Sequence, residues 1–210
     1  MTVLLLVRHG HTDAAGTRLT GWARGVHLNE RGRAEAAALV DRLDGVRVEA
    51  IYSSPLERCR ETAAPLAKAR RLSVRVRRGF IEVGYGEWSG RPISQLRRTK
   101  LWRQVMHTPS NVRFPGGESL LDVQARVVDT TFEISRVHPR GTVVVVSHAD
   151  VIRLLVTHLA GMHPDHLQRL IIDTASISAI ALGDQIPRLL KMNDTGDLAS
   201  LRGPRAKVRG

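Results

Sequence analysis

Two continuous apolar runs stand out along the chain, at residues 3–7 and 143–146. The first consists of valine and leucine and the second of valine alone. Both end abruptly in polar residues, which is typical of a strand buried on both faces of a parallel sheet. Shorter apolar or alternating stretches predict further strands at residues 50–53, 72–76, 176–182 and 188–192. The pattern therefore predicts a sheet built around two fully buried strands.

Helical spacing of apolar residues and capping signals predict helices between these strands. Asn29 is a favourable N-cap for a helix that runs to about residue 43. Residues 54–57, Ser-Pro-Leu-Glu, match a capping box with proline at the first helical position and predict a helix to about residue 69. Further helices are expected at residues 94–107, 119–138, 151–156 and 165–170.

Strands that alternate with helices indicate an α/β fold, which we expect to be a three-layer α/β/α sandwich with a mainly parallel central sheet. Residues 1–200 are expected to form a single domain, because a chain of 210 residues suits one domain and no linker or repeat interrupts it. A glycine-punctuated loop and a basic helix predict a small cap over about residues 77–117. The basic segment at residues 201–210 is expected to be a flexible tail.

Cysteine content and apolar run length bear on the cellular compartment. A single cysteine, Cys59, excludes an internal disulfide and favours a reducing compartment. The N-terminal apolar run is too short for a signal-peptide core or a membrane span. We therefore expect a soluble, cytoplasmic protein with no membrane partner.

The chain is strongly basic, with 32 lysines and arginines against 20 acidic residues and a formal net charge of +12. Such an excess suits nucleic acid, a membrane surface or small anionic substrates. Aromatic residues make up only 4% of the chain, which leaves few platforms for base stacking, and no helix-turn-helix, zinc-finger or RNA-binding motif is visible. The expected partner is therefore a small anionic, phosphorylated substrate rather than nucleic acid.

Histidines follow both of the buried strands. Arg8 and His9 come directly after the first run, and His148 closely follows the second. Ligands of open α/β sheets bind just outside the carboxyl ends of the strands, so parallel neighbouring strands would bring His9 and His148 together. A neutral imidazole attacks a phosphoryl group and a guanidinium holds its oxygens, which makes these residues candidates for phosphoryl transfer.

Two further charged residues are candidates for the same site. Arg58 lies at the end of the first predicted turn of a helix that follows a strand, where the helix N-terminus adds amide donors and a partial positive charge. Glu82 lies among apolar neighbours, which favours a raised pKa and a protonated carboxylic acid. Glu87, in the same loop, is expected to face solvent.

Several motifs, in this order, resemble those of the histidine phosphatase superfamily, also called the phosphoglycerate mutase-like family. They are Arg8-His9-Gly10-His11-Thr12, Leu19-Thr20-Gly21-Trp22, the helix start at 28–33, residues 53–63 with Arg58, Glu82 with Gly86-x-Trp88-x-Gly90, and Val146-Ser147-His148. The resemblance extends from Met1 to about Leu198. It implies the fold expected above and a phosphatase or mutase activity.

The resemblance also implies a role for each candidate residue. His9 is implied to be the nucleophile that becomes phosphohistidine, and Glu82 to protonate the leaving oxygen and then to activate water. Arg8, Arg58 and His148 are implied to line the phosphate pocket and to stabilise the charge on the phosphoryl group during transfer. Thr20 and Gly21 are implied to bind substrate. No metal and no cofactor are implied, and the resemblance allows a homodimer.

Some positions depart from the pattern of that family. His11 stands where the family usually has Glu or Gln, Ala14-Ala15 replaces a loop asparagine, and Ala23-Arg24 replaces a carboxylate. These changes affect the expected substrate contacts and leave the catalytic set intact. The segment between Glu82 and His148 is short compared with that of true mutases, which favours hydrolysis over transfer between hydroxyls.

The favoured hypothesis is a metal-independent phosphomonoesterase that hydrolyses a small phosphorylated metabolite through a phosphohistidine intermediate on His9. A phosphoglycerate mutase, with the same residues and a different acceptor, is the main alternative. A metallohydrolase built on His9 and His11, and a non-catalytic protein that binds anions or nucleic acid, are the further alternatives.

Overall fold

A computed structural model describes residues 1–183 and 185–196 of the chain. The strands are β1 (Thr2–Arg8), β2 (Val48–Ser53), β3 (Val74–Val76), β4 (Thr142–Ser147), β5 (Ile177–Leu182) and β6 (Arg188–Asp194). The α-helices are α1 (Glu30–Arg42), α2 (Glu57–Arg70), α3 (Ile93–Leu96), α4 (Lys100–His107), α5 (Leu120–Val137) and α6 (Ala149–Leu159). The 3-10 helices are η1 (Arg78–Phe80), η2 (Gly86–Trp88), η3 (Pro109–Asn111) and η4 (Pro164–Arg169). The tail predicted at residues 201–210 lies outside the described residues.

The strands form one six-stranded sheet in the order β3-β2-β4-β1-β5-β6. The pairs from β3 to β1 are parallel, and the pairs β1–β5 and β5–β6 are antiparallel. The two apolar runs of the sequence are the central neighbours β1 and β4. This arrangement agrees with the predicted mainly parallel sheet.

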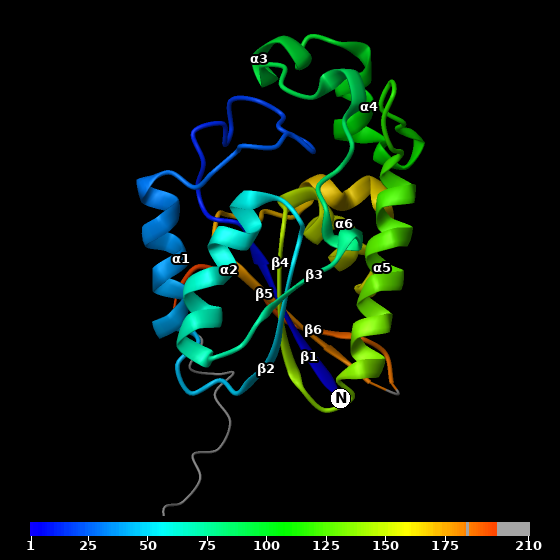
Figure 1. The fold of residues 1–210 in the computed structure, drawn as a ribbon. Coiled ribbons are helices and arrows are strands. Elements are labelled where there is room, and N and C mark those ends of the chain that lie inside the picture. The colour runs from blue at the N-terminus through cyan, green and yellow to red at the C-terminus, as the bar shows by residue number, and fades with distance from the viewer. Residues whose placement is uncertain (184, 197–210) are drawn as a thin grey trace, which may run out of the picture.

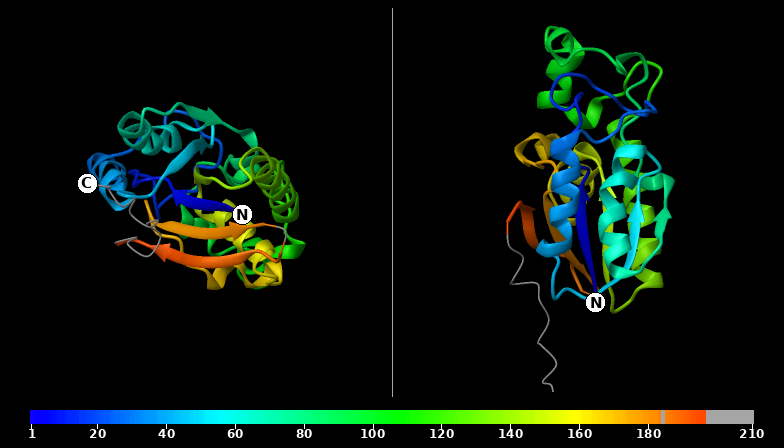
Figure 2. Two further views of the ribbon diagram at one scale, coloured as in Figure 1. Left: turned by 90° about the horizontal axis from the view of Figure 1, so that it is seen from below. Right: turned by 60° about the vertical axis from the view of Figure 1, so that its left-hand side comes forward.

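Helices cover both faces of the sheet, as Figures 1 and 2 show. Leu5 and Val7 of β1 pack into one core cluster with α1 and α2. Leu4 and Leu6 pack into the other cluster, with α5 and α6. Because successive side chains of a strand point to opposite faces, a strand covered on both faces needs apolar residues at every position. This explains the unbroken apolar run of β1.

The helices α3 and α4 lie beyond the carboxyl ends of the central strands, in the region for which a cap was predicted (Figure 1). The single helix predicted over residues 94–107 is wrong, because the chain forms two helices there. The Thr99 hydroxyl accepts a hydrogen bond from the Trp102 N–H (3.1 Å) and donates one to the Leu96 carbonyl (2.8 Å). A threonine that caps one helix and bonds the end of the previous one breaks the predicted continuity.

The capping box predicted at residues 54–57 is also wrong. The helix α2 begins at Glu57, its N-cap is Leu56, and no side chain caps it. The Ser54 hydroxyl instead lies 2.8 Å from Nε2 of His148. The Ser54 side chain, which the local sequence predicts to cap the helix, thus bonds His148 at the end of the neighbouring strand β4.

The N-cap predicted at Asn29 is confirmed. The Asn29 side chain accepts a hydrogen bond from the Gly32 N–H (3.0 Å), and Ser119 and Asp122 form a reciprocal capping box at the start of α5. The helix predicted at residues 165–170 is the 3-10 helix η4 rather than an α-helix. Within the described part of the chain, no helix combines the length and apolar character that a bilayer crossing requires.

Candidate active site

The register of β1 against β4 brings the two strand-end histidines together. Arg8 pairs with Ser147, so His9 and His148 leave the sheet at the same level. The His9 N–H donates a hydrogen bond to the Ser147 carbonyl (2.9 Å). The centroids of the two imidazole rings lie 5.2 Å apart, with an angle of 63° between the ring planes. The predicted meeting of these histidines is therefore confirmed.

The loop that follows His9 packs closely against α1. A Cβ atom added to Gly10 would lie 2.6 Å from the Gly32 carbonyl oxygen, and one added to Gly32 would lie 2.1 Å from the His11 carbonyl oxygen. Only glycine allows this approach of two backbones. The Gly10 N–H also donates a hydrogen bond to the Thr62 hydroxyl of α2 (2.9 Å). These contacts hold the loop, and with it His9, on the helical layer.

His9 is buried, with 7% of its surface exposed, and its surroundings define its protonation state. Nδ1 lies 2.8 Å from the Gly10 carbonyl oxygen. Because a carbonyl only accepts hydrogen bonds, Nδ1 carries the hydrogen, and Nε2 keeps a free lone pair. Burial, and next the positive charge of Arg58, lower the pKa of His9 to about 3. The imidazole is therefore neutral near pH 7 and has an available nucleophilic nitrogen.

His148 is fully buried and both of its ring nitrogens are engaged. Nδ1 lies 3.3 Å from Nη2 of Arg58, and Nε2 lies 2.8 Å from the Ser54 hydroxyl. Because a guanidinium only donates, Nδ1 accepts and Nε2 carries the hydrogen. Burial, and next the charge of Arg58, lower the pKa of His148 well below its ordinary value. The neutral His148 ring thus holds Arg58 in place beside His9.

Arg58 is almost completely buried, with 1% exposure, and retains unused donors. Its Nη2 donates to the Gly21 carbonyl (2.9 Å) as well as to His148. Its Nε and Nη1, and Nε of Arg8, have no hydrogen-bond partner among the residues that the structure describes. A buried cation costs several kcal/mol unless an opposite charge or hydrogen-bond acceptors compensate it. These free N–H groups suit the oxygens of a bound oxyanion such as a phosphoryl group.

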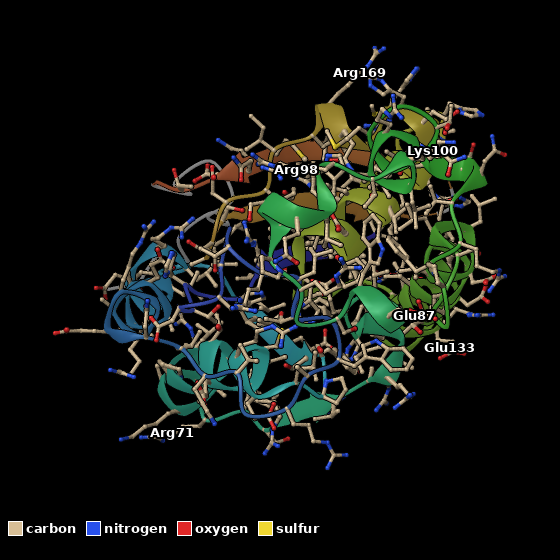
Figure 3. The ribbon with its side chains drawn as sticks, turned by 90° about the horizontal axis from the view of Figure 1, so that it is seen from above. Arg71, Glu87, Arg98, Lys100, Glu133 and Arg169 are labelled. Carbon is tan, nitrogen blue, oxygen red and sulfur yellow. The ribbon has the colours of Figure 1, made fainter. Side chains whose placement is uncertain are left out.

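Glu82 is buried, with 9% exposure, and its carboxyl group faces the same cluster. Oε1 accepts a hydrogen bond from the Val83 N–H (2.9 Å), and Oε2 lies 3.6 Å from Nδ1 of His148. Burial, and next the negative charge of Asp150, raise the pKa of Glu82 to about 7. A carboxyl group with this pKa can both donate and accept a proton near neutral pH. Glu87 is exposed, as predicted (Figure 3).

Arg126 and Glu118 form a clamp on the loop that carries Glu82. The guanidinium of Arg126 bonds both carboxylate oxygens of Glu118, at 2.9 and 3.0 Å. Glu118 also accepts a hydrogen bond from the Gly84 N–H (2.8 Å). Arg126 further donates, at 2.8, 2.9 and 3.0 Å, to the carbonyl oxygens of Gly79, Ile81 and Glu82. The clamp therefore fixes the backbone on both sides of Glu82.

Replacing Arg126 with alanine is expected to lower kcat by roughly tenfold to a hundredfold, because a small displacement of a catalytic group is this costly. The high-pH limb of the rate profile is expected to move, since it reports the environment of Glu82. Steady-state kinetics between pH 4 and 9 on protein shown to be folded by circular dichroism measures both effects.

Arg113→Ala is the matched control for the clamp. Arg113 also pairs with a carboxylate, Asp122, at 2.7 Å, but the pair is exposed and lies away from Glu82. Exposed pairs contribute little to stability, so both the rate and the pH profile are expected to stay unchanged. Equal rate losses in Arg113→Ala and Arg126→Ala, with no shift in either pH profile, would contradict a role of the clamp in positioning Glu82.

Thr20 and Gly21, which were predicted to bind substrate, differ in their contacts. The Gly21 carbonyl holds Arg58, so it acts on the site through that arginine. The Thr20 carbonyl accepts a hydrogen bond from the Ala23 N–H (2.9 Å) and so closes a turn. The contact of either residue with substrate stays a prediction.

His11 is engaged by neighbours of its own. Its Nδ1 lies 2.9 Å from Nδ2 of Asn29, and its backbone N–H donates to Glu35 (2.8 Å). Across residues 1–183 and 185–196, no group of three or more His, Cys, Asp or Glu side chains is placed to hold a metal ion. The described side chains thus offer the pair His9 and His11 no third ligand, and chelation is the test of the metallohydrolase alternative.

Sequence reasoning missed Ser54, Glu118 and Arg126 as parts of the site. Ser54 was assigned to a helix cap. Glu118 precedes α5 and Arg126 lies within it, and neither shows any local sign of a site. Their partners lie far away along the chain: 34 residues separate Gly84 from Glu118, and 94 separate Ser54 from His148. No local pattern encodes such contacts.

The site therefore combines a neutral histidine nucleophile, two arginines with free donors and a carboxyl group with a raised pKa. Phosphoryl transfer depends mainly on positioning and on stabilisation of the charge on the phosphoryl oxygens, and this set supplies both. Fold and site together fit the class of phosphoryl-transfer enzymes that use a histidine.

Comparison with known proteins agrees with this class. The profile of the histidine phosphatase superfamily (branch 1) matches residues 4–195, and the chain belongs to this superfamily. Phosphoserine phosphatase 1 of Hydrogenobacter thermophilus is 33% identical over 197 residues, which are 93% of each chain. The predicted family and the predicted enzyme class, a phosphatase, are confirmed.

Solved structures show the same fold. YhfR of Bacillus stearothermophilus superposes with a TM-score of 0.86 at 27% identity, over 92% of this chain and 98% of that chain. A mycobacterial glucosyl-3-phosphoglycerate phosphatase in complex with VO3 superposes with a TM-score of 0.83 at 29% identity, over 91% of this chain and 98% of that chain. The predicted α/β fold class is confirmed.

Proposed function

We propose that the protein is a metal-independent phosphomonoesterase that hydrolyses a small phosphorylated metabolite through a phosphohistidine intermediate on His9. The observation that carries the proposal is the neutral imidazole of His9, with Nδ1 held by the Gly10 carbonyl, beside the unpartnered N–H groups of Arg58 and Arg8. A neutral imidazole beside free cationic donors supports nucleophilic attack on a bound phosphoryl group.

In the first step, the lone pair of Nε2 of His9 attacks phosphorus. The bond from phosphorus to the alcohol oxygen breaks, its electron pair stays on that oxygen, and the carboxyl proton of Glu82 moves to it. The imidazole gains positive charge, which the hydrogen bond from Nδ1 to the Gly10 carbonyl stabilises. Arg58 and Arg8 hold the phosphoryl oxygens throughout the step.

In the second step, the carboxylate of Glu82 takes a proton from a water molecule that attacks phosphorus. The phosphorus–nitrogen bond breaks, its electrons return to Nε2, and inorganic phosphate leaves. The raised pKa of Glu82, about 7, suits a group that must act first as an acid and then as a base.

Phosphate release in the presence of EDTA tests the proposal. We expect turnover of p-nitrophenyl phosphate to be unchanged by the chelator, because the mechanism needs no metal ligand. We expect a 32P-labelled enzyme, quenched during turnover, to hold a label that is stable to alkali and lost in acid, as a phosphorus–nitrogen bond is. Complete loss of activity in EDTA, or a label stable to acid, would overturn the proposal.

A phosphoglycerate mutase remains the second candidate, because a second hydroxyl in place of water would use the same residues. The discriminating assay is incubation with 3-phosphoglycerate. Inorganic phosphate as the product supports hydrolysis, whereas 2-phosphoglycerate without phosphate release would establish the mutase.

A small anionic metabolite is the proposed substrate class. The relative from H. thermophilus is named a phosphoserine phosphatase, and the mycobacterial structure is that of a glucosyl-3-phosphoglycerate phosphatase. Cationic side chains, among them Arg98, Lys100 and Arg169, lie around the cap end of the molecule in Figure 3, and they attract anions. A cytoplasmic location and a homodimer stay part of the proposal.

A further inference from the structure

A cavity of about 260 Å³ lies between the cap and the start of α6. Four aromatic side chains line it, those of Tyr85, Trp88, Trp102 and Phe114. The Trp88 and Trp102 rings are stacked with centroids 6.3 Å apart, and the Tyr85 and Phe114 rings meet edge to face at 5.0 Å. The cavity is slightly smaller than the roughly 300–1,000 Å³ of pockets that take drug-sized ligands, so it suits a group of one or two rings.

The cavity lies beside the two chain segments that carry Glu82 and His148. One of its walls is Asp150, two residues after His148, and another is Tyr85, three residues after Glu82. The Tyr85 hydroxyl donates a hydrogen bond to Asp150 (2.7 Å). This bond connects the loop that carries Glu82 to the helix that follows His148. The cavity is thus beside the loop of Glu82, the residue assigned above to protonate the leaving alcohol.

The charges that line the cavity cancel one another. Among its lining residues, Asp150 and Arg153 are the charged ones, and they pair with each other at 2.9 Å. Arg153 also donates to the Leu170 carbonyl (2.8 Å). A second phosphate, a carboxylate or an ammonium group would lose its hydration here without gaining a free counter-charge. An uncharged apolar ring gains from burial against the aromatic walls.

We propose that this cavity binds the alcohol part of the substrate and selects phosphomonoesters whose alcohol carries an uncharged aromatic or heteroaromatic ring. The inference rests on the proposed function, because it assigns the leaving group of that same reaction. The cap residues that line the cavity thereby determine specificity.

The test compares two primary alkyl phosphates, 2-phenylethyl phosphate and ethyl phosphate, which differ in the ring. We expect kcat/KM to be about tenfold to a hundredfold higher for the phenylethyl ester, as burial of one phenyl group predicts. For phosphoserine and 3-phosphoglycerate, which carry charges on the alcohol, we expect kcat/KM to be equal to or lower than that for ethyl phosphate. Equal values for the two alkyl esters, or a preference for a charged ester, would overturn the inference.

Filling the cavity provides the second arm of the test. Val105 lines the cavity from α4, and we expect Val105→Trp to lower kcat/KM for the phenylethyl ester about tenfold or more relative to kcat/KM for ethyl phosphate. Arg103→Trp, at an exposed position of the same helix, is the control and is expected to change neither value. Turnover of ethyl phosphate shows that the site is intact in each variant.

The outcomes separate the inference from the proposed function. If ethyl phosphate is hydrolysed but the ring brings no gain, or if Val105→Trp slows both esters equally, the specificity inference is wrong and the phosphatase proposal stands. If the wild type hydrolyses neither of these esters nor p-nitrophenyl phosphate, and forms no phosphoenzyme from any of them, both are wrong.

Discussion

Replacing His9 with alanine is expected to lower phosphate release from p-nitrophenyl phosphate by roughly four orders of magnitude or more. The reason is that no neighbouring nitrogen is available to replace Nε2 of His9 as the nucleophile. His148 lies closest in the site, but Arg58 and Ser54 occupy its two ring nitrogens. Initial rates, and the absence of a labelled phosphoenzyme in the variant, measure the effect.

His11→Ala is the matched control for this variant. His11 lies on the same loop, and its ring is bonded to Asn29. The phosphohistidine mechanism predicts a loss of less than about tenfold, because the variant keeps the nucleophile, whereas a metal site built on both histidines predicts a loss as large as that of His9→Ala. If His9→Ala keeps its activity and its thermal unfolding is unchanged, His9 is not the nucleophile.

The second large effect is expected for Glu82→Gln. Hydrolysis of ethyl phosphate is expected to slow by roughly a hundredfold to ten-thousandfold, because the alkoxide then leaves without a proton donor. The first step on p-nitrophenyl phosphate is expected to slow less, since nitrophenolate is a stable leaving group. Because water activation is lost too, phosphoenzyme should accumulate from this ester. Quenched-flow measurement of the labelled enzyme separates the two steps.

The pH profile of the wild-type enzyme tests the same residue. With a pKa raised to about 7, Glu82 is protonated below that pH, and the acid needed in the first step is lost as the pH rises through it. With a pKa lowered to about 3, His9 stays neutral above that value, so it causes no loss between pH 4 and 7. We expect kcat/KM for an alkyl ester to fall above about pH 7 and Glu82→Gln to lack this fall.

Glu87→Gln is the control for both measurements, because it removes an exposed carboxylate from the same loop. Rates and the high-pH limb are expected to match those of the wild type. A high-pH limb that persists in Glu82→Gln would assign it to another group and would contradict the role of Glu82 as the acid.

The strand-end residues of the site could be predicted from the sequence because their signal is local. A buried parallel strand must be apolar at every position, so the polar residues that end it, Arg8 and His9, are conspicuous. The same holds for His148 after β4. Since carboxyl ends of parallel strands meet at one edge, the meeting of the two histidines followed from topology alone.

Local signals were misleading where a tertiary partner competed for a side chain. Ser54 matched a capping box but bonds His148, and α2 begins at Glu57 instead. Thr99 was expected inside a helix but ends one helix and caps the next. A hydroxyl forms whichever hydrogen bond the folded chain offers, and the sequence does not show which partner is near.

The sequence by itself predicted the mainly parallel sheet, the family resemblance and the candidates for nucleophile, phosphate-binding arginines and acid, because each prediction depends on short patterns of residues. Only the tertiary structure decided how these groups behave. Burial and the approach of Arg58 set the pKa of His9, and the clamp of Arg126 and Glu118 places the acid. The tertiary structure also decided that aromatic residues of the predicted cap line one cavity together with Asp150. Desolvation and contacts between distant segments exist only once the chain is folded, so they cannot be predicted from residues that are neighbours in the sequence.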